Sequence, residues 1–178
     1  PCLTGMKQRR LKTLLANDIS LLAYHLPLDV HPEVGNNVQL ARQLDITVEG
    51  PLEPDNTRTV GLLGSLAQPL SARDFARRVH DVLGREPLLV EEDRLVSRIG
   101  WCTGGGQGYI DQAIAAGVDL YLTGEASEQT YHSARENGVS FIAAGHHATE
   151  RYGVQALGEY LSRRFAIEHL FIDCPNPI

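Results

Sequence analysis

The carboxyl-terminal half of the chain repeats one hydrophobic pattern three times. Each apolar run ends in glycine, and a segment whose apolar positions have helical spacing follows it. The apolar runs are 96–104, 118–124 and 139–145, and the helical segments are 107–117, 127–137 and 147–165. Strands that alternate with helices of this length indicate βαβ units. We therefore predict an α/β fold with mixed sheets flanked by helices, to which the apolar segment 167–173 adds a last strand.

The first part of the chain begins with a helical pattern and continues with an apolar run. Leucines at helical intervals predict a helix over 6–18, and the apolar residues 19–26 predict a buried strand. Residues 35–45 again show helical spacing, and Asn36 or Asn37 is the expected N-terminal cap. This region therefore predicts a helix, a strand and a second helix in succession.

The pattern changes after this helix. Two extended segments, 46–53 and 57–66, are separated by turn-forming residues. A helix follows that Ser71 opens as a cap and Gly84 closes. We treat residues 46–92 as a candidate inserted or second lobe.

Composition and charge exclude several classes of protein. The chain has 178 residues, 43% of them hydrophobic, and a formal net charge of -6. No run approaches the roughly 18 to 20 apolar residues of a membrane span, and the basic residues are scattered, which argues against nucleic acid as the main partner. Three cysteines without a C-x-x-C pair suit the cytoplasm. We expect a soluble cytoplasmic protein without a membrane partner.

Three polar loops follow the three apolar runs, and in α/β sheets ligands gather where strands end. The loops read CTGGGQG, TGEASEQ and AGHHATE. The glycine-rich loop lacks the Lys-Ser or Lys-Thr of a phosphate loop and does not match the dinucleotide pattern. A tight turn and an anion-binding loop both remain open for it. Trp101 beside it is expected to pack rather than to stack on a ligand.

Two clusters could carry metal chemistry. His146 and Glu150 lie four residues apart and would share one face of a helix, whereas His147 points about 100° away. Imidazole and carboxylate at that spacing can reach one divalent cation, although a polar helix start is the alternative. A second cluster follows the predicted strand 19–26, and its imidazoles and carboxylates favour a metal site as a group. Its members are His25, Asp29, His31 and Glu33.

These motifs resemble the Nif-three-like family, also named GTP cyclohydrolase type-two homologues. The resemblance rests on His25-Leu-Pro-Leu-Asp29, TGE, GHHATE, WCTGGGQ and FIDCPNP, and it extends over the whole chain. It is strongest to enterobacterial members. The resemblance implies a toroidal homohexamer with two divalent ions per subunit, iron, zinc or manganese, facing an internal cavity.

The resemblance also implies roles for single residues. Asp29 matches the bridging ligand, and His146 and Glu150 match two late ligands. The family's remaining ligands are a His-His pair upstream of the aspartate, so 1–178 corresponds to the carboxyl-terminal two-thirds of a member, and residues are expected to precede Pro1. Glu125 and His25 are candidates for proton transfer, with orientation of the ligands as the alternative.

Two functions remain in competition at the level of sequence. The first is a metal-dependent hydrolase of the GTP cyclohydrolase type, which acts on a nucleotide or a related ring or phosphate compound. The second is a non-catalytic metal-bearing ring that serves as a scaffold or regulator and binds proteins or nucleic acid. The two share the metal site and differ in turnover.

Overall fold

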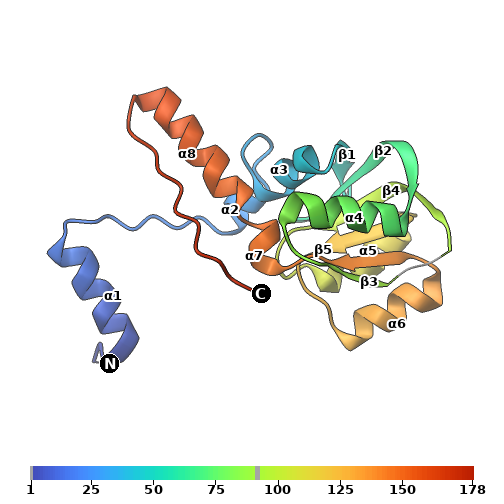
Figure 1. Ribbon diagram of the computed structural model, residues 1–178, viewed down its shortest axis with the longest axis horizontal. Helices are drawn as coiled ribbons and strands as arrows, with labels where there is room; N and C mark the ends of the chain where they lie inside the picture. The colour runs from blue at the N-terminus through green and yellow to red at the C-terminus, as the bar shows by residue number, and fades with distance from the viewer. Residues whose placement is uncertain (1, 91–92) are drawn as a thin grey trace.

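A computed structural model describes residues 2–90 and 93–178 and shows one mixed sheet between two layers of helices. The helices in chain order are α1 (Gly5–Ala16), α2 (Leu26–Asp29), α3 (Asn36–Gln43), α4 (Ala72–Leu83), η1 (Gln107–Tyr109), α5 (Ile110–Ala115), α6 (Glu128–Asn137), α7 (His146–Thr149) and α8 (Tyr152–Phe165). The strands are β1 (Ile46–Pro51), β2 (Leu62–Ser71), β3 (Leu88–Val90), β4 (Leu95–Cys102), β5 (Leu120–Thr123) and β6 (Ser140–Ala143). Figure 1 shows their arrangement.

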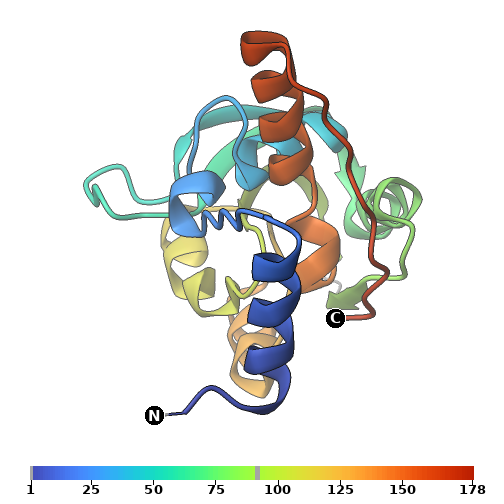
Figure 2. The same ribbon diagram turned by 90° about the vertical axis from the view of Figure 1, so that its left-hand side faces the viewer.

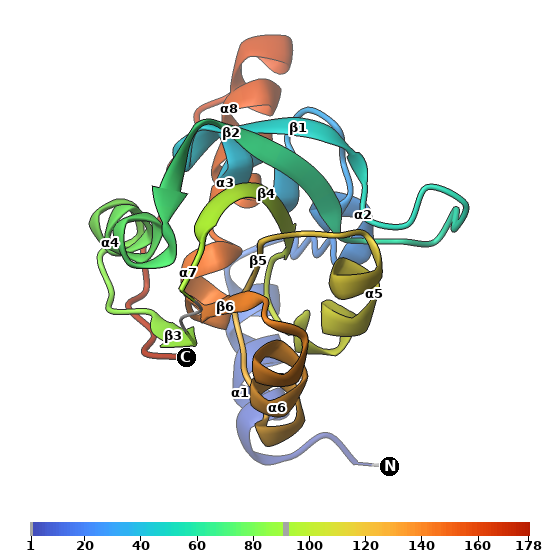
Figure 3. The ribbon, with the colours of Figure 1, turned by 90° about the vertical axis from the view of Figure 1, so that its right-hand side faces the viewer.

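The strands of the described residues pair in the order β1-β2-β4-β5-β6-β3. The central strands β4, β5 and β6 are parallel, whereas β1, β2 and β3 join antiparallel at the two sides. Figure 3 shows α4 on one side of the sheet and α5 with α6 on the other. The predicted α/β fold with a mixed sheet and flanking helices is confirmed. The strand β3 was not predicted, because three residues give too short a pattern.

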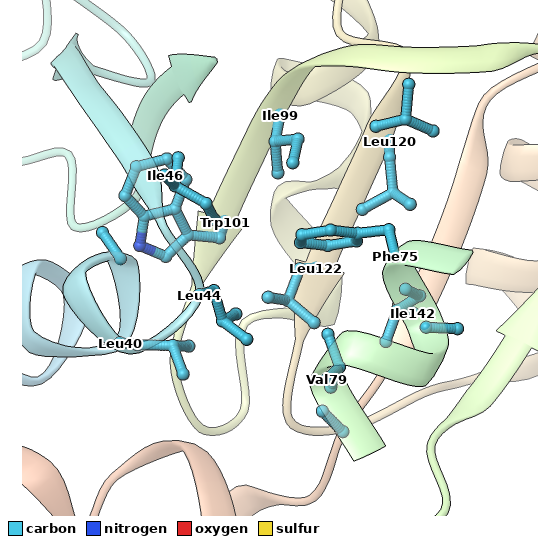
Figure 4. Packing of buried hydrophobic residues seen from close by; sticks show 14 of the residues in the cluster. Leu40, Leu44, Ile46, Phe75, Val79, Ile99, Trp101, Leu120, Leu122 and Ile142 are labelled. Atoms are coloured by element: carbon cyan, nitrogen blue, oxygen red, sulfur yellow. The ribbon is translucent and has the colours of Figure 1, made fainter. Parts of the chain in front are cut away.

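Each face of the sheet carries its own apolar core. On the first face, side chains of α3 and α4 pack on the strands around Phe75 and Trp101, which are both fully buried (Figure 4). The indole Nε1 of Trp101 donates to the backbone carbonyl of Asn37 at 3.0 Å, so this side chain packs as expected. The second core lies under α5 and α6 and includes Tyr121 and Phe141.

Local sequence signals fix α4 well. The Ser71 side chain accepts a hydrogen bond from the backbone N–H of Asp74, as an N-terminal cap does, and Gly84 ends the helix with φ of +70°. The buried residues of this helix are Ala72, Phe75, Ala76, Val79 and Leu83, which form one stripe along it. The predicted helix 71–84 is therefore confirmed with both of its ends.

A half-buried carboxylate, that of Asp119, links the start of β5 to β4. Both backbone N–H groups of Ser97 and Arg98 donate to Oδ2 of Asp119, at 3.0 and 2.9 Å, and Arg94 forms an ion pair with the same carboxylate. Burial opposes ionisation of Asp119, but these hydrogen bonds and the positive charge outweigh it and lower its pKa. The ionised form of Asp119 is therefore part of the fold.

Two predicted strands are absent. Residues 19–25 and 167–173 form no strand, and large apolar side chains along both segments are exposed, among them Leu22 and Ile172. A strand needs a neighbouring strand for its backbone hydrogen bonds, and no described strand pairs with either segment. Figure 2 shows the segment after α8 running back beside that helix toward α7. No helix among the described residues is long and apolar enough to cross a membrane.

Two further predictions need correction at the helices. Gly35, not Asn36 or Asn37, is the cap residue of α3, and the two amides instead bind other segments. The predicted helix 147–165 is interrupted and forms α7 and α8. At the start of α8, where the first N–H groups of a helix have no acceptor within it, the backbone N–H of Gly153 donates to the side chain of Asn36.

Candidate metal centre

The carboxyl ends of the parallel strands bring the three polar loops together. The backbone N–H of Gly124 donates to the carbonyl of Gly104, and the backbone N–H of Gly145 donates to the carbonyl of Gly124. Loops after β4, β5 and β6 are thus joined in the order of their strands. The three loops therefore meet at one rim of the sheet, where the sequence placed the candidate site, and α7 begins directly after the last of them.

The imidazole of His146 lies between two carboxylates. Its Nδ1 is 2.6 Å from Oε1 of Glu125, and its Nε2 is 3.1 Å from Oε2 of Glu150. The spacing of four residues places His146 and Glu150 on one face of the helical turn, as predicted. Glu125 comes from the neighbouring strand end, so one imidazole connects the loops that follow β5 and β6. An imidazole held in this way presents one nitrogen to the partner that orients the ring and leaves the other nitrogen for a metal ion.

The ionisable side chains of this group shift one another's pKa. The hydrogen bond that the Glu125 carboxylate accepts raises the pKa of His146, and the same bond lowers the pKa of Glu125. Burial and then the negative charge of Asp29 raise the pKa of Glu150. Carboxylates from two segments therefore lie close enough to repel each other, and a divalent cation between them would relieve that repulsion.

Asp29 comes from a segment of the chain far from His146 and Glu150 in the sequence. It ends the short helix α2 and is 5% exposed, and its Oδ1 accepts a hydrogen bond from Nδ2 of Asn36 at 2.7 Å. His25 precedes the same helix. Both residues line a groove of about 630 Å³ together with Glu150 and His169. His169 was assigned to no site by sequence, and the structure places it on this wall.

His31 and Glu33 lie apart from this group. The Nδ1 of His31 accepts backbone N–H groups of Glu33 and Val34, so its ring closes a turn. The backbone carbonyl of Glu33 accepts from side chains of α3, and its own side chain is exposed. The second sequence cluster is therefore divided: Asp29 and His25 face the groove that holds Glu150, and the other two residues stabilise the loop before α3.

The glycine loop after β4 supports the site through close approach. Gly104 has φ of +65°, and a Cβ on it would lie 1.9 Å from Oε1 of Glu150. Its N–H donates to Oγ1 of Thr149, and its carbonyl accepts from Oγ1 of Thr123. A tight turn that lets the backbone approach a neighbouring loop thus describes the observed contacts. Cys102 beneath the loop is buried, and burial raises the pKa of its thiol to about 12.

The fit of this group to a metal ion is partial. Within residues 2–90 and 93–178, no three His, Cys, Asp or Glu side chains form a cluster ready to hold an ion. The donor types nevertheless suit a divalent cation, because Nε2 of His146 lies 3.1 Å from Oε2 of Glu150 and Asp29 lines the same groove as Glu150. These residues supply part of a coordination shell.

The carboxamides of Asn36 and Asn37 also belong to this region, and their roles in it were missed by the sequence interpretation. Both side chains are buried. Asn36 contacts the carboxylate of Asp29, whereas Asn37 bonds the backbone, donating to the carbonyl of Val60 and accepting from the N–H of Thr103. They frame the site without being candidate ligands themselves.

Comparisons with known proteins agree along almost the whole chain. A family model described as Duf34/NIF3 (NGG1p interacting factor 3) matches residues 2–177. A Pseudomonas aeruginosa protein named GTP cyclohydrolase 1 type 2 homolog is 80% identical over 177 residues, which cover 99% of this chain and 70% of that protein. The Escherichia coli protein of the same name is 52% identical over 179 residues, with 99% and 70% covered.

Solved structures show the same architecture. The structure titled protein ybgI, unknown function, has a TM-score of 0.94 and 52% identity, and covers 100% of this chain with 71% of its own. The structure of TTHA1606 from Thermus thermophilus has a TM-score of 0.88 and 32% identity, with the same coverage of 100% and 71%. The chain is thus similar to proteins about 1.4 times its length, as the 70% share implies.

Proposed function

The chain belongs to the Duf34/NIF3 family, and from this premise we propose that it binds divalent metal ions at Asp29, His146 and Glu150 and uses them to hydrolyse a nucleotide or a related ring or phosphate compound. The observation that carries the proposal is the imidazole of His146, which Glu125 orients at Nδ1 while Nε2 faces Glu150. The relatives' name, GTP cyclohydrolase 1 type 2 homolog, points to the same substrate class.

Each residue has a definite task in this proposal. Deprotonated Nε2 of His146 and the carboxylates of Asp29 and Glu150 would hold two ions together with ligands beyond those described. Iron, zinc or manganese suits imidazole and carboxylate donors. Bound ions of this kind supply acidified water and polarise an oxygen of the substrate. The carboxylate of Glu125 would accept the hydrogen bond of Nδ1–H and so keep the ring turned toward the ions.

The groove explains where a substrate would lie. Glu150 lines both the groove of about 630 Å³ and a neighbouring one of about 440 Å³ that also contains His146. Tyr24 and His25 line the larger groove, so an aromatic ring and an imidazole face the space next to the proposed ions. A flat heterocyclic substrate would stack on the former and could exchange a proton with the latter.

Metal analysis of the full-length protein tests the ligands. Asp29→Ala, His146→Ala and Glu150→Ala should each weaken binding by more than the roughly 10- to 100-fold that outer partners contribute, because each removes a donor atom. His147→Ala is the matched control, since it removes an imidazole one residue away whose Nε2 is 3.9 Å from Asp173. Metal content equal to the wild type in all three ligand variants would refute the site.

Turnover decides between the two functions. The metal-loaded protein is offered GTP and other nucleotides in the presence of manganese, zinc or iron, and ring opening or phosphate release is followed. Hydrolysis that is lost in the ligand variants supports the enzyme. Full metal occupancy without turnover of any nucleotide would leave the metal-bearing scaffold as the function.

Assembly into a homohexamer is part of the proposal. Large apolar side chains are exposed along α1, along 19–26 and along the segment after α8, including Leu15 at 78%, Leu21 at 73% and Ile172 at 77%. Exposed apolar surface of this extent favours burial against further protein. Light scattering of the full-length protein should give six times the subunit mass, and a monomer at micromolar concentration would contradict this assembly.

A further inference from the structure

One buried carboxamide connects the two sides of the candidate metal centre. The Nδ2 of Asn36 donates to Oδ1 of Asp29 at 2.7 Å, and its Oδ1 accepts the backbone N–H of Gly153 at 2.8 Å. Asp29 ends α2, and Gly153 lies in the first turn of α8, three residues after Glu150. A single side chain therefore spans from one proposed ligand to the segment that carries another.

The direction of this bridge is fixed by chemistry. An ionised carboxylate only accepts hydrogen bonds and a backbone N–H only donates them, so the amide of Asn36 can satisfy both partners in one orientation alone. Asn36 is 5% exposed, and no bulk water competes for its two bonds. An amide held at both ends in a buried place keeps its partners at a constant separation.

The bridge also requires the glycine. A Cβ at Gly153 would lie 2.5 Å from Oδ1 of Asn36, which is closer than a carbon and an oxygen can approach without bonding. The absence of a side chain at this position lets the amide reach the N–H at the start of α8. The same contact lies at the start of α8, directly after the break that follows Glu150.

We infer that Asn36 is the positioning residue of the proposed metal centre: it orients the carboxylate of Asp29 and sets its distance from Glu150. This inference rests on the proposed function. Asn36 would touch neither ion, and it acts through Asp29 and through the main chain at Gly153. Asn37 next to it bonds main-chain atoms and no carboxylate, so the two amides differ in role.

The test measures zinc affinity and the visible absorption of bound cobalt in the full-length protein. Asn36→Ala should weaken zinc binding about 10- to 100-fold, as the loss of a partner behind a ligand does. It should also change the cobalt d–d bands, because their position and intensity report the geometry of the donor atoms. Loss of stability alone would leave both quantities unchanged in the folded fraction.

A second variant and a control separate position from stability. Gly153→Ala changes no donor atom and no atom of Asn36, yet it displaces the amide, so it should shift the cobalt bands and the affinity in the same direction. Asp119→Asn weakens another polar link between segments, at β4 and β5, and should lower stability while zinc affinity and cobalt bands stay as in the wild type.

Three outcomes decide the matter. Weaker zinc binding and altered cobalt bands in both variants, but not in Asp119→Asn, support the inference. Wild-type affinity and bands in Gly153→Ala, or in folded Asn36→Ala, overturn it while the proposed function stands. A wild-type protein that binds neither zinc nor cobalt would refute the proposed function, and the inference with it.

Discussion

Replacement of Glu125 by glutamine separates orientation of a ligand from proton transfer. The change keeps the shape of the side chain and an oxygen that can accept from Nδ1 of His146, and it removes the negative charge. The contact is short, at 2.6 Å, and both side chains are about 40% exposed, at 38% and 40%. The ring of His146 should therefore keep its direction, while its Nε2 becomes a weaker electron-pair donor to a metal ion.

The size of the effect follows from this single contact. Loss of the charge alone should weaken metal binding about 10-fold, which is the lower end for such partners and corresponds to about 1.4 kcal/mol. Glu125→Ala removes the acceptor as well and should approach about 100-fold. If Glu125 also moved protons in the reaction, Glu125→Gln would lose about 10² to 10⁴ in turnover at saturating metal.

Zinc titration of the full-length protein and turnover at saturating metal measure the two quantities separately. Glu128→Gln is the matched control, because it removes the same charge three residues away from an exposed position at the start of α6. Unchanged affinity in both Glu125 variants would refute the orienting role. A large loss of turnover with full metal occupancy would instead place Glu125 among the groups that react.

Two further predictions concern stability and the glycine loop. Asp119→Asn should lower the free energy of unfolding by about 2 kcal/mol at neutral pH, because it weakens hydrogen bonds to a charged acceptor, whereas exposed Asp111→Asn should change it little. The folded state lowers the pKa of Asp119. The difference in free energy of unfolding between the wild type and Asp119→Asn should therefore be constant above about pH 4 and shrink as the pH falls further. Urea unfolding at several pH values measures this difference, and a difference that grew on acidification would refute the prediction. Gly104→Ala should cost about 1 to 2 kcal/mol for its positive φ and weaken metal binding by displacing Glu150, while Gly108→Ala, with open space around it, should do neither.

The parts of the fold that sequence predicted are those fixed by neighbouring residues. The helix after Ser71 has its cap, its apolar stripe and its closing glycine within one short stretch, and the three glycine-ended strands repeat a local pattern. The strands expected at 19–26 and 167–173 had the right composition, but no strand among the described residues pairs with them. Whether a segment forms a strand depends on a neighbouring strand that can accept its backbone hydrogen bonds, and the apolar run itself carries no information about that neighbour.

In the candidate site, too, contacts between residues close in the sequence could be predicted, and others could not. His146 and Glu150 could be paired from their spacing, because one helical turn brings them together whatever surrounds it. Glu125 lies 21 residues from His146 in the chain, yet their contact could be anticipated, since both follow adjacent parallel strands. The hydrogen bond beside the break between α7 and α8 could not be anticipated, because it joins residues 117 positions apart in the chain.

The sequence of α3 nevertheless indicates that Asn36 is buried among polar partners. In α3 the buried positions are Asn36, Asn37, Leu40 and Ala41, so each asparagine lies one turn before an apolar residue on the inner face. A helix cap needs no such alignment, whereas a buried carboxamide needs partners for its N–H groups and its oxygen. Two asparagines at core positions therefore indicate polar atoms of other segments on that face, and here these are the carboxylate of Asp29 and the loop after β4.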